Sequence, residues 1–287
     1  MNSTSNVLTK ILRPTKIDTD HFQGLGSTND GAENTYGGHF LGQASAAAMQ
    51  TVDADRHLHS LHAYFIRGGT PAMPIDYHVD RIRDGRSFCT RRVRATQNDK
   101  VLFELIASLG KQESGPSIAM ERPQDFSELP APESITPYQQ LLMAQDPLPL
   151  PEDWITRDAG LDLRVINAPW SPHGVGENKT IRSWFRASPK VENDPHLHAA
   201  MLAYQTDESL ADILLIPFDK TWCSEGTFCV SLDHALWFHE PININNWHFI
   251  DQKTVVAKNG RGVGNGYVWT QDGTLVASFT QEVLLRI

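Results

Sequence analysis

Residues 36–49 read YGGHFLGQASAAAM. The stretch has no charged residue, and its second half is rich in alanine, the residue with the highest helix propensity. A helix that is apolar almost all round is stable only when other elements surround it. The stretch therefore predicts a buried helix at the centre of a fold that wraps around it.

Four strands are expected after this helix. Hairpin-type turn residues separate the second from the third at Asp84-Gly85, and the third from the fourth at Asn98-Asp99. One long helix followed by such an antiparallel meander suits a curved sheet around the helix. The expected strands cover residues 59–66, 75–83, 87–97 and 101–110.

The second half of the chain repeats this order. Asp194 offers an N-cap and Pro195 suits the first helical position, which predicts a second helix over residues 196–204. A strand at residues 180–187 should precede this helix. The strands expected after it cover residues 228–238, 247–258, 262–270 and 274–285.

Matching sequences in the two halves support a duplication. They keep their order at an offset of about 170–175 residues, which is too long for a solenoid repeat. We therefore expect two copies of one α+β unit. The matching pairs are residues 60–65 (SLHAYF) with 231–237 (SLDHALW), 84–86 (DGR) with 259–261 (NGR), and 96–99 (TQND) with 270–273 (TQDG).

Prolines separate the two copies. Eight of them fall between residues 116 and 151, where the periodicity fades, and only a short helix near Tyr138–Met143 is expected there. The predicted organisation is a first unit over residues 1–112, a proline-rich connector over 113–164 and a second unit over 165–287.

Composition excludes several classes of partner. The chain of 287 residues has a formal net charge of −9, which argues against nucleic acid and anionic membrane surfaces. Three widely separated cysteines without a CxxC pair argue against a disulfide framework, and no apolar run of about 18 residues occurs. We therefore expect a cytoplasmic protein with neither nucleic-acid nor membrane partners.

Together these sequences resemble the acyl-CoA thioesterase II family over nearly the whole chain, from about Leu8 to the end. The resemblance implies an α+β double hot-dog fold, with two helix-in-sheet units in one chain. It also implies hydrolysis of fatty acyl-CoA to a free fatty acid and CoA, without metal or cofactor. We expect a homo-oligomer, a dimer or tetramer of double hot-dogs. The stretches that carry the resemblance are residues 37–44, 59–65, 83–97, 232–239 and 270–282.

The family's catalytic aspartate, serine or threonine, and glutamine together hold the attacking water. By motif, the resemblance places them at Asp207, Ser231 and Gln281. Each has a structural alternative: Asp207 could cap a following turn, Ser231 could be an ordinary strand hydroxyl, and Gln281 could be a core amide bonded to backbone. Gln281 interrupts the apolar face of its strand, as a functional amide would.

The first half lacks this set of residues. Ser60 matches Ser231, but the match to Gln281 is Ser108 in one register or Lys111 in the other, and Asp207 aligns near Thr51. We therefore predict one active site per chain, carried by the second half.

Candidate substrate-binding residues lie in the first half. They are Gly38, in the glycine pair before the buried helix, His62, in the matched strand, and Gly85 with Arg86, at a turn that the family shares. Six arginines between residues 81 and 94 could meet CoA phosphates, Arg86 first among them. The alternative is a solvated hairpin face, with partners such as Asp80 and Asp84.

Two other functions remain open. A hot-dog enoyl-CoA hydratase would need a close Asp–His pair, for which Asp233 and His239 are the candidates. A non-catalytic acyl-CoA-binding protein would hold the ligand without releasing thiol. A metal site is not expected, because His196 and His198 lack the i, i+4 spacing of a helical ligand pair.

Overall fold

The computed structural model describes residues 5–27, 34–167, 180–222 and 224–287. The helices in these ranges are α1 (Val7–Ile11), α2 (Gly37–Met49), α3 (Tyr138–Met143), α4 (Glu152–Thr156), α5 (Pro195–Gln205) and α6 (Leu210–Leu215), with short 3-10 turns at Phe126–Glu128, Pro132–Ser134 and Ile216–Phe218. The strands are β1 (Thr15–Asp18), β2 (His21–Gly24), β3 (His57–Phe65), β4 (Ile75–Asp84), β5 (Phe88–Gln97), β6 (Lys100–Gly110), β7 (Leu161–Asn167), β8 (Thr180–Ala187), β9 (Phe228–Ser231), β10 (Asp233–Phe238), β11 (His248–Lys258), β12 (Arg261–Thr270) and β13 (Leu275–Arg286).

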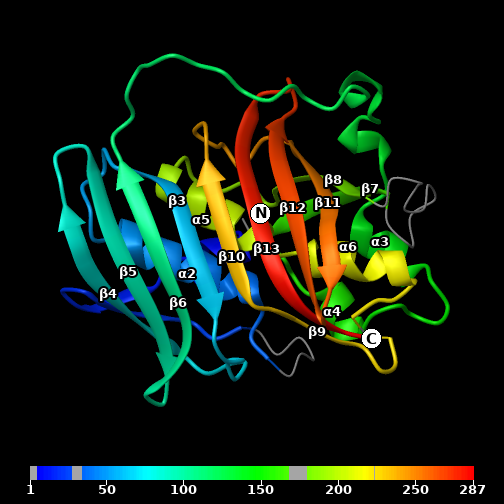
Figure 1. Ribbon diagram of the computed structural model, residues 1–287, viewed down its shortest axis with the longest axis horizontal. Helices are drawn as coiled ribbons and strands as arrows, with labels where there is room; N and C mark the ends of the chain where they lie inside the picture. Colours follow the sequence, from blue (N-terminus) through cyan, green and yellow to red (C-terminus); the bar gives the residue numbers. More distant parts are fainter. Residues whose placement is uncertain (1–4, 28–33, 168–179, 223) are drawn as a thin grey trace.

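The strands of both halves form one antiparallel sheet (Figure 1). Its order is β1-β2-β4-β5-β6-β3-β10-β13-β12-β11-β8-β7, and β9 pairs with β13. The halves meet where β3 pairs with β10, with Leu61 opposite Leu236. From this junction outward the first half runs β3-β6-β5-β4-β2 and the second half runs β10-β13-β12-β11-β8. The two halves therefore repeat one topology about an approximate two-fold axis between β3 and β10.

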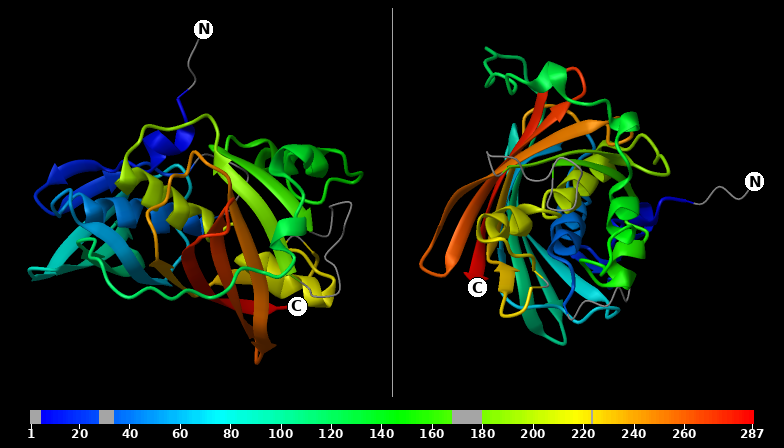
Figure 2. Two further views of the ribbon diagram at one scale, coloured as in Figure 1. Left: turned by 90° about the horizontal axis from the view of Figure 1, so that it is seen from above. Right: turned by 90° about the vertical axis from the view of Figure 1, so that its right-hand side faces the viewer.

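The helices α2 and α5 pack against each other on one side of this sheet (Figure 2). They run antiparallel, because Gly38 lies against Tyr204 and Gly42 lies against Ala200. A Cβ atom on Gly38 would stand 2.3 Å from the Tyr204 carbonyl oxygen, and one on Gly42 would stand 3.1 Å from the Ala200 carbonyl oxygen. Only glycine permits this approach of the two helices.

The buried helix predicted at residues 36–49 is confirmed. Every residue of α2 after Gly37 is buried, and one apolar core joins α2 and α5 to the inner faces of the strands. Helix α5, predicted at residues 196–204, is buried from Leu197 onward. The duplicated helix-in-sheet arrangement is the double hot-dog fold expected from the resemblance.

Several elements went unpredicted. Strands β1 and β2 lie in the segment before Thr35, and β7 crosses the boundary predicted at residue 165. The strand predicted at residues 228–238 is interrupted at Leu232. The Glu282 backbone N–H donates to the Asp233 carboxylate there, in place of a backbone carbonyl of the neighbouring strand. Helix α6 fits where Gly262 and Gly264 leave room on β12 for leucine side chains.

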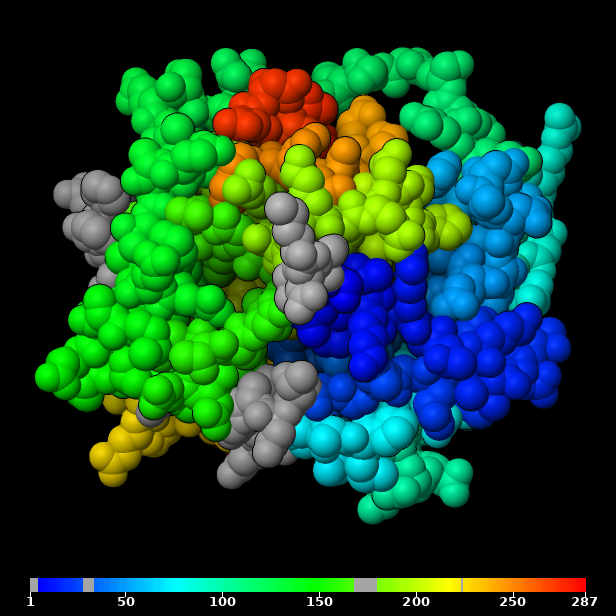
Figure 3. All heavy atoms as spheres, turned by 180° about the vertical axis from the view of Figure 1, so that it is seen from behind, coloured from blue at the N-terminus to red at the C-terminus, as the bar shows by residue number. Residues whose placement is uncertain are grey.

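The connector packs on the second half from Phe126 onward, as the green region at the left of Figure 3 shows, whereas its residues 113–122 are exposed. It buries Phe126, Leu142 and Ile155, and its Glu133 accepts a hydrogen bond from the Trp247 indole (2.7 Å). Apolar burial and side-chain hydrogen bonds thus fix the short helices of this segment to the second half. Among the helices of the described ranges, none has both the length and the hydropathy to cross a membrane.

The helix contact yields a stability prediction. We expect Gly38→Ala to lower the free energy of unfolding by about 1–3 kcal/mol, because the new methyl meets backbone that cannot move aside. Urea denaturation would measure the loss. The control Gly115→Ala, whose Cβ meets no atom within 4 Å, should change it by less than about 0.5 kcal/mol. Equal effects of the two substitutions would contradict the proposed constraint.

Candidate active site

Asp207 lies where the end of α5 meets the start of α2. It follows the α5 C-cap Thr206 and is 7% exposed. Its carboxylate accepts a hydrogen bond from the Gly38 backbone N–H. A Cβ on Gly37 would stand 2.5 Å from Asp207 Oδ2, so the first residue of α2 must be small. Gly37 therefore makes room for the carboxylate. Asp207 does not cap α6, whose N-cap is Ser209.

The start of α2 is electrostatically suited to an anion. Its N-cap, Tyr36, makes no side-chain capping bond, and its first turn holds no acidic residue. The N-terminus of a helix carries a partial positive charge and N–H groups without helical partners. Asp207, brought from the other half of the chain, therefore lies against the positive end of α2.

The other two predicted catalytic residues bond to each other and to Asp207. Ser231, at the end of β9, donates from Oγ to Asp207 Oδ1 (3.4 Å) and accepts from Gln281 Nε2 (2.7 Å). Gln281 is fully buried on the inner face of β13. The structure thus brings together all three residues that the resemblance indicated.

His234 completes this network and was not predicted. Its Nδ1 donates to Gln281 Oε1 (2.6 Å), since an amide oxygen can only accept, and its Nε2 lies 3.1 Å from Thr206 Oγ1. The side chain is 1% exposed. Its position in the sequence was the available signal for a site residue. His234 lies two residues before Leu236 in β10, and side chains two residues apart on a strand face the same side, so a polar ring is expected on the inward face.

Burial changes the acid–base properties of the network. It raises the pKa of Asp207 to about 7, and the neighbouring Glu208 carboxylate adds to the rise. The hydrogen bonds from Gln281, Gly38 and Ser231 oppose it. Burial also lowers the pKa of His234 to about 4, so its ring is neutral at pH 7. A carboxyl group with a pKa near 7 is suited to accept a proton at neutral pH.

The connector holds the residue next to Asp207. Arg157, at the end of α4, donates to Glu208 (2.7 Å) in a pair whose two side chains are only 12% and 16% exposed. The Arg157 guanidinium also stacks on Trp154, 3.5 Å from the ring centre. Residues 152–157 therefore anchor the segment that carries the carboxylate.

The predicted substrate-binding residues are dispersed. Gly38 belongs to the network through its N–H. His62 is exposed on the outer face of the sheet, with its ring against Trp237. Gly85 and Arg86 lie at the turn between β4 and β5, where their carbonyls accept from Arg56. The structure therefore does not bring His62, Gly85 and Arg86 to Asp207.

The arginine-rich hairpin largely pairs within the first half. Arg92 binds Asp80 and Arg91 binds Asp84, the two partners named for the solvated alternative. Arg91, however, is 1% exposed, and its Nε also donates to Thr51 Oγ1 (2.7 Å). A solvated face is therefore the wrong description for this one arginine.

The Asp–His pair considered for a hydratase does not form. Asp233 begins β10 and accepts from the Glu282 N–H (2.7 Å), whereas His239 follows the other end of the strand and bonds Ser278 Oγ (2.9 Å). About five extended residues separate the two side chains, more than hydrogen-bond reach.

The strand registers identify the first-half counterparts of the site. At the offset of the matched turns 96–99 and 270–273, Ala107 corresponds to Gln281, and its cross-strand partner Leu61 corresponds to His234. The same registers set Leu58 opposite Leu109 and Ser231 opposite Val283, so Leu58 corresponds to Ser231.

Ser60 is therefore not the positional match of Ser231, and neither Ser108 nor Lys111 is that of Gln281. Thr51, two residues past α2, does match Asp207, two residues past α5.

The fold and the buried acid–amide network define a double hot-dog protein with a polar site where the end of α5 meets the start of α2. Comparisons with known families agree: "Acyl-CoA thioesterase N-terminal domain" matches residues 26–110 and "Acyl-CoA thioesterase C-terminal domain" matches residues 125–285. The chain belongs to the acyl-CoA thioesterase II family, and it is a thioester hydrolase.

Individual relatives match along the whole chain. Acyl-CoA thioesterase 2 of Haemophilus influenzae is 33% identical, over 100% of this chain and 99% of its own. Human acyl-coenzyme A thioesterase 8 is 31% identical, over 99% and 90%. The crystal structure of the acyl-CoA thioesterase II TesB2 of Mycobacterium marinum superposes with a TM-score of 0.78 at 30% identity, covering 98% of both chains.

The pKa of Asp207 predicts a pH-dependent stability. A carboxyl group with a raised pKa in the folded state contributes stability that is fully present below its unfolded pKa, near 4, and is lost as pH rises through about 7. Asn cannot ionise, so Asp207→Asn should melt a few degrees above the wild type at pH 8. Calorimetry at pH 5 and pH 8 tests this, since the difference should shrink at pH 5. A difference that does not depend on pH would contradict the prediction.

Proposed function

We propose that the enzyme hydrolyses fatty acyl-CoA with a water molecule activated by Asp207 and oriented by Ser231 and Gln281. The observation that carries this proposal is the burial of Asp207, with its raised pKa, within hydrogen-bonding reach of a hydroxyl and an amide. Acid–base catalysis is most efficient when the pKa of the group lies near the working pH.

Asp207 can carry both proton transfers of the hydrolysis. The water oxygen attacks the thioester carbonyl carbon while Asp207 accepts one proton from the water. The tetrahedral intermediate then expels CoA as a thiolate, which takes that proton from Asp207. The products are the fatty acid and the CoA thiol, and Asp207 returns to its carboxylate form.

The start of α2 supplies the electrostatic part of the mechanism. The partial positive charge at Gly37 and Gly38 stabilises the oxygen on which negative charge develops, because preorganised dipoles act strongly in a buried site. Such dipoles do not have to reorganise during the reaction. The two glycines thus have a chemical role besides allowing the helix contact.

The test is thiol release from acyl-CoA substrates of graded chain length. Asp207→Asn should lower kcat by about 10²–10⁴-fold, the usual contribution of a general base. Gln281→Ala should lower it by about 10²-fold, whereas Ser231→Thr keeps a hydroxyl and should retain activity. Near-wild-type rates in Asp207→Asn would overturn the assignment.

The same experiment includes a pH profile. Wild-type kcat/KM should rise with pH through about 7, because only the carboxylate form of Asp207 accepts a proton. The variant Asp207→Asn should lack this acidic limb. A wild-type limb centred near pH 4 would contradict the role given to burial.

His234 should act by holding the Gln281 amide. Its Nδ1 donates to the amide oxygen and so keeps Nε2 of Gln281 toward Ser231. His234→Asn places an N–H near the position of Nδ1 and should largely keep kcat. His234→Gln places its N–H nearer the position of Nε2 and should lower kcat about tenfold or more with little change in KM. Equal rates in the two variants would overturn this role.

A further inference from the structure

A cavity of about 550 Å³ lies at the opposite end of the helix pair from Asp207. It is bordered by Met49 at the end of α2 and by Pro195 and His196 at the start of α5. Because α2 and α5 are antiparallel, this end corresponds to the Asp207 site under the approximate two-fold axis. The cavity therefore lies beside the first-half counterpart of the active site, from which Leu58 reaches its lining.

The counterpart lacks the groups that hydrolysis requires. Thr51 stands in place of Asp207 and bonds Arg91, while Leu58, Leu61 and Ala107 replace the hydroxyl, the imidazole and the amide. The start of α5 is already capped, because Asp194 accepts hydrogen bonds from the backbone N–H groups of His196 and Leu197. This end therefore has neither a counterpart of the Asp207 carboxylate nor a free helix end for an oxyanion.

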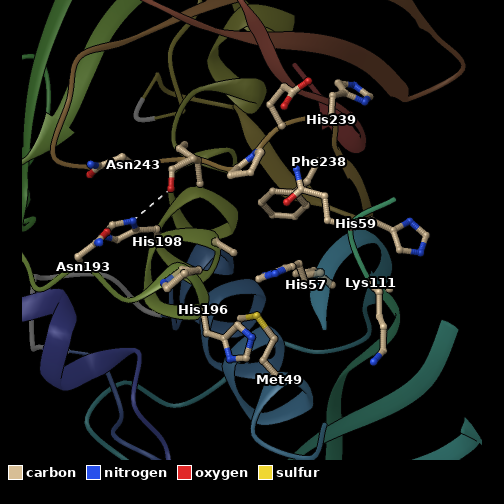
Figure 4. Close-up of a pocket in the computed structure, with 18 of the residues that line it drawn as sticks. Met49, His57, His59, Lys111, Asn193, His196, His198, Phe238, His239 and Asn243 are labelled. Atoms are coloured by element: carbon tan, nitrogen blue, oxygen red, sulfur yellow. Dashed lines mark hydrogen bonds between the residues drawn. The ribbon is translucent and has the colours of Figure 1, made fainter. Parts of the chain in front are cut away.

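Its lining combines an apolar wall with a nitrogen-rich rim (Figure 4). Met49, Leu58, Phe88, Ala199, Phe238 and Ile242 form the wall. The rim carries His57, His59, His196, His239 and Lys111, against the single carboxylate of Glu240. Within the described ranges no group of side chains is arranged to hold a metal ion, so these histidines do not indicate one.

Lys111 is the one Lys or Arg side chain of this rim, in a molecule whose net charge is −9. His57 is exposed and Lys111 pairs only at the surface, with Asp55, so both can reach an anion at the mouth of the cavity. A cavity of this size falls within the range of small-molecule sites, which are mostly apolar with a few placed polar groups.

We propose that this cavity binds a fatty carboxylate, with its chain on the apolar wall and its carboxylate at the rim, without any reaction. The choice of a fatty chain rests on the proposed function, whose product is such a carboxylate. Each enzyme molecule would then hold one reacting and one resident acyl chain.

The test is calorimetric titration of dodecanoate into the wild type and into the double variant H57A/K111A. Both substituted side chains are exposed, so the fold should be kept. Dodecanoate affinity should fall about tenfold, the loss expected when a charge-assisted contact is removed. A second variant, Ala199→Phe, fills the cavity from α5 and should abolish this binding.

The matched control is H78A/K253A, which removes one histidine and one lysine away from the cavity. It should bind dodecanoate like the wild type, and all three variants should release thiol from acyl-CoA at the wild-type rate. The proposal is overturned if the wild type shows no saturable binding, or if H57A/K111A and the control bind equally. A wrong catalytic assignment would appear separately, as thiol release by Asp207→Asn.

Discussion

At Gly38 and Gly42 the backbone of α2 lies directly against that of α5, and the rest of the molecule depends on this contact. It sets the distance between the two helices, and so the width of the helical layer that the sheet covers. It also brings the start of α2 beside the end of α5, where Asp207 meets the Gly38 N–H. Packing therefore requires glycine at residue 38, and room for the Asp207 carboxylate requires it at residue 37.

The site in turn depends on exclusion of water. Asp207 has a useful pKa because burial disfavours its charge, while the Gly38, Ser231 and Gln281 hydrogen bonds keep the ionised form accessible. The connector contributes through Arg157, which neutralises Glu208 beside the carboxylate. A free Glu208 would raise the pKa of Asp207 further, so the segment that carries Arg157 tunes the acid–base balance of the site.

Local sequence patterns predicted much of this structure, because helix burial and hairpin turns depend on nearby residues. The alanine-rich helix, its proline-started counterpart and most strands lie where expected. Contacts between distant segments could not be predicted in the same way. His234 meets Gln281 across 47 positions, and Arg91 reaches Thr51 across 40. The Ser60–Ser231 match failed because letter identity aligned the two strands two residues away from the correspondence that their pairing with β6 and β13 defines.

The pairing of β3 with β10 makes the chain equivalent to a dimer of two units that share one covalent backbone. In a true homodimer of identical subunits, each substitution appears at both symmetry-related positions, so a buried Arg91 could not arise at one end without arising at the other. The fused chain is free of this restriction. Arg91 lies opposite Ala107, whereas Gly264 lies opposite Gln281, the counterpart of Ala107. The second half therefore has a glycine where the first half has Arg91. One end of the helix pair could thus lose its reactivity while the other end kept it.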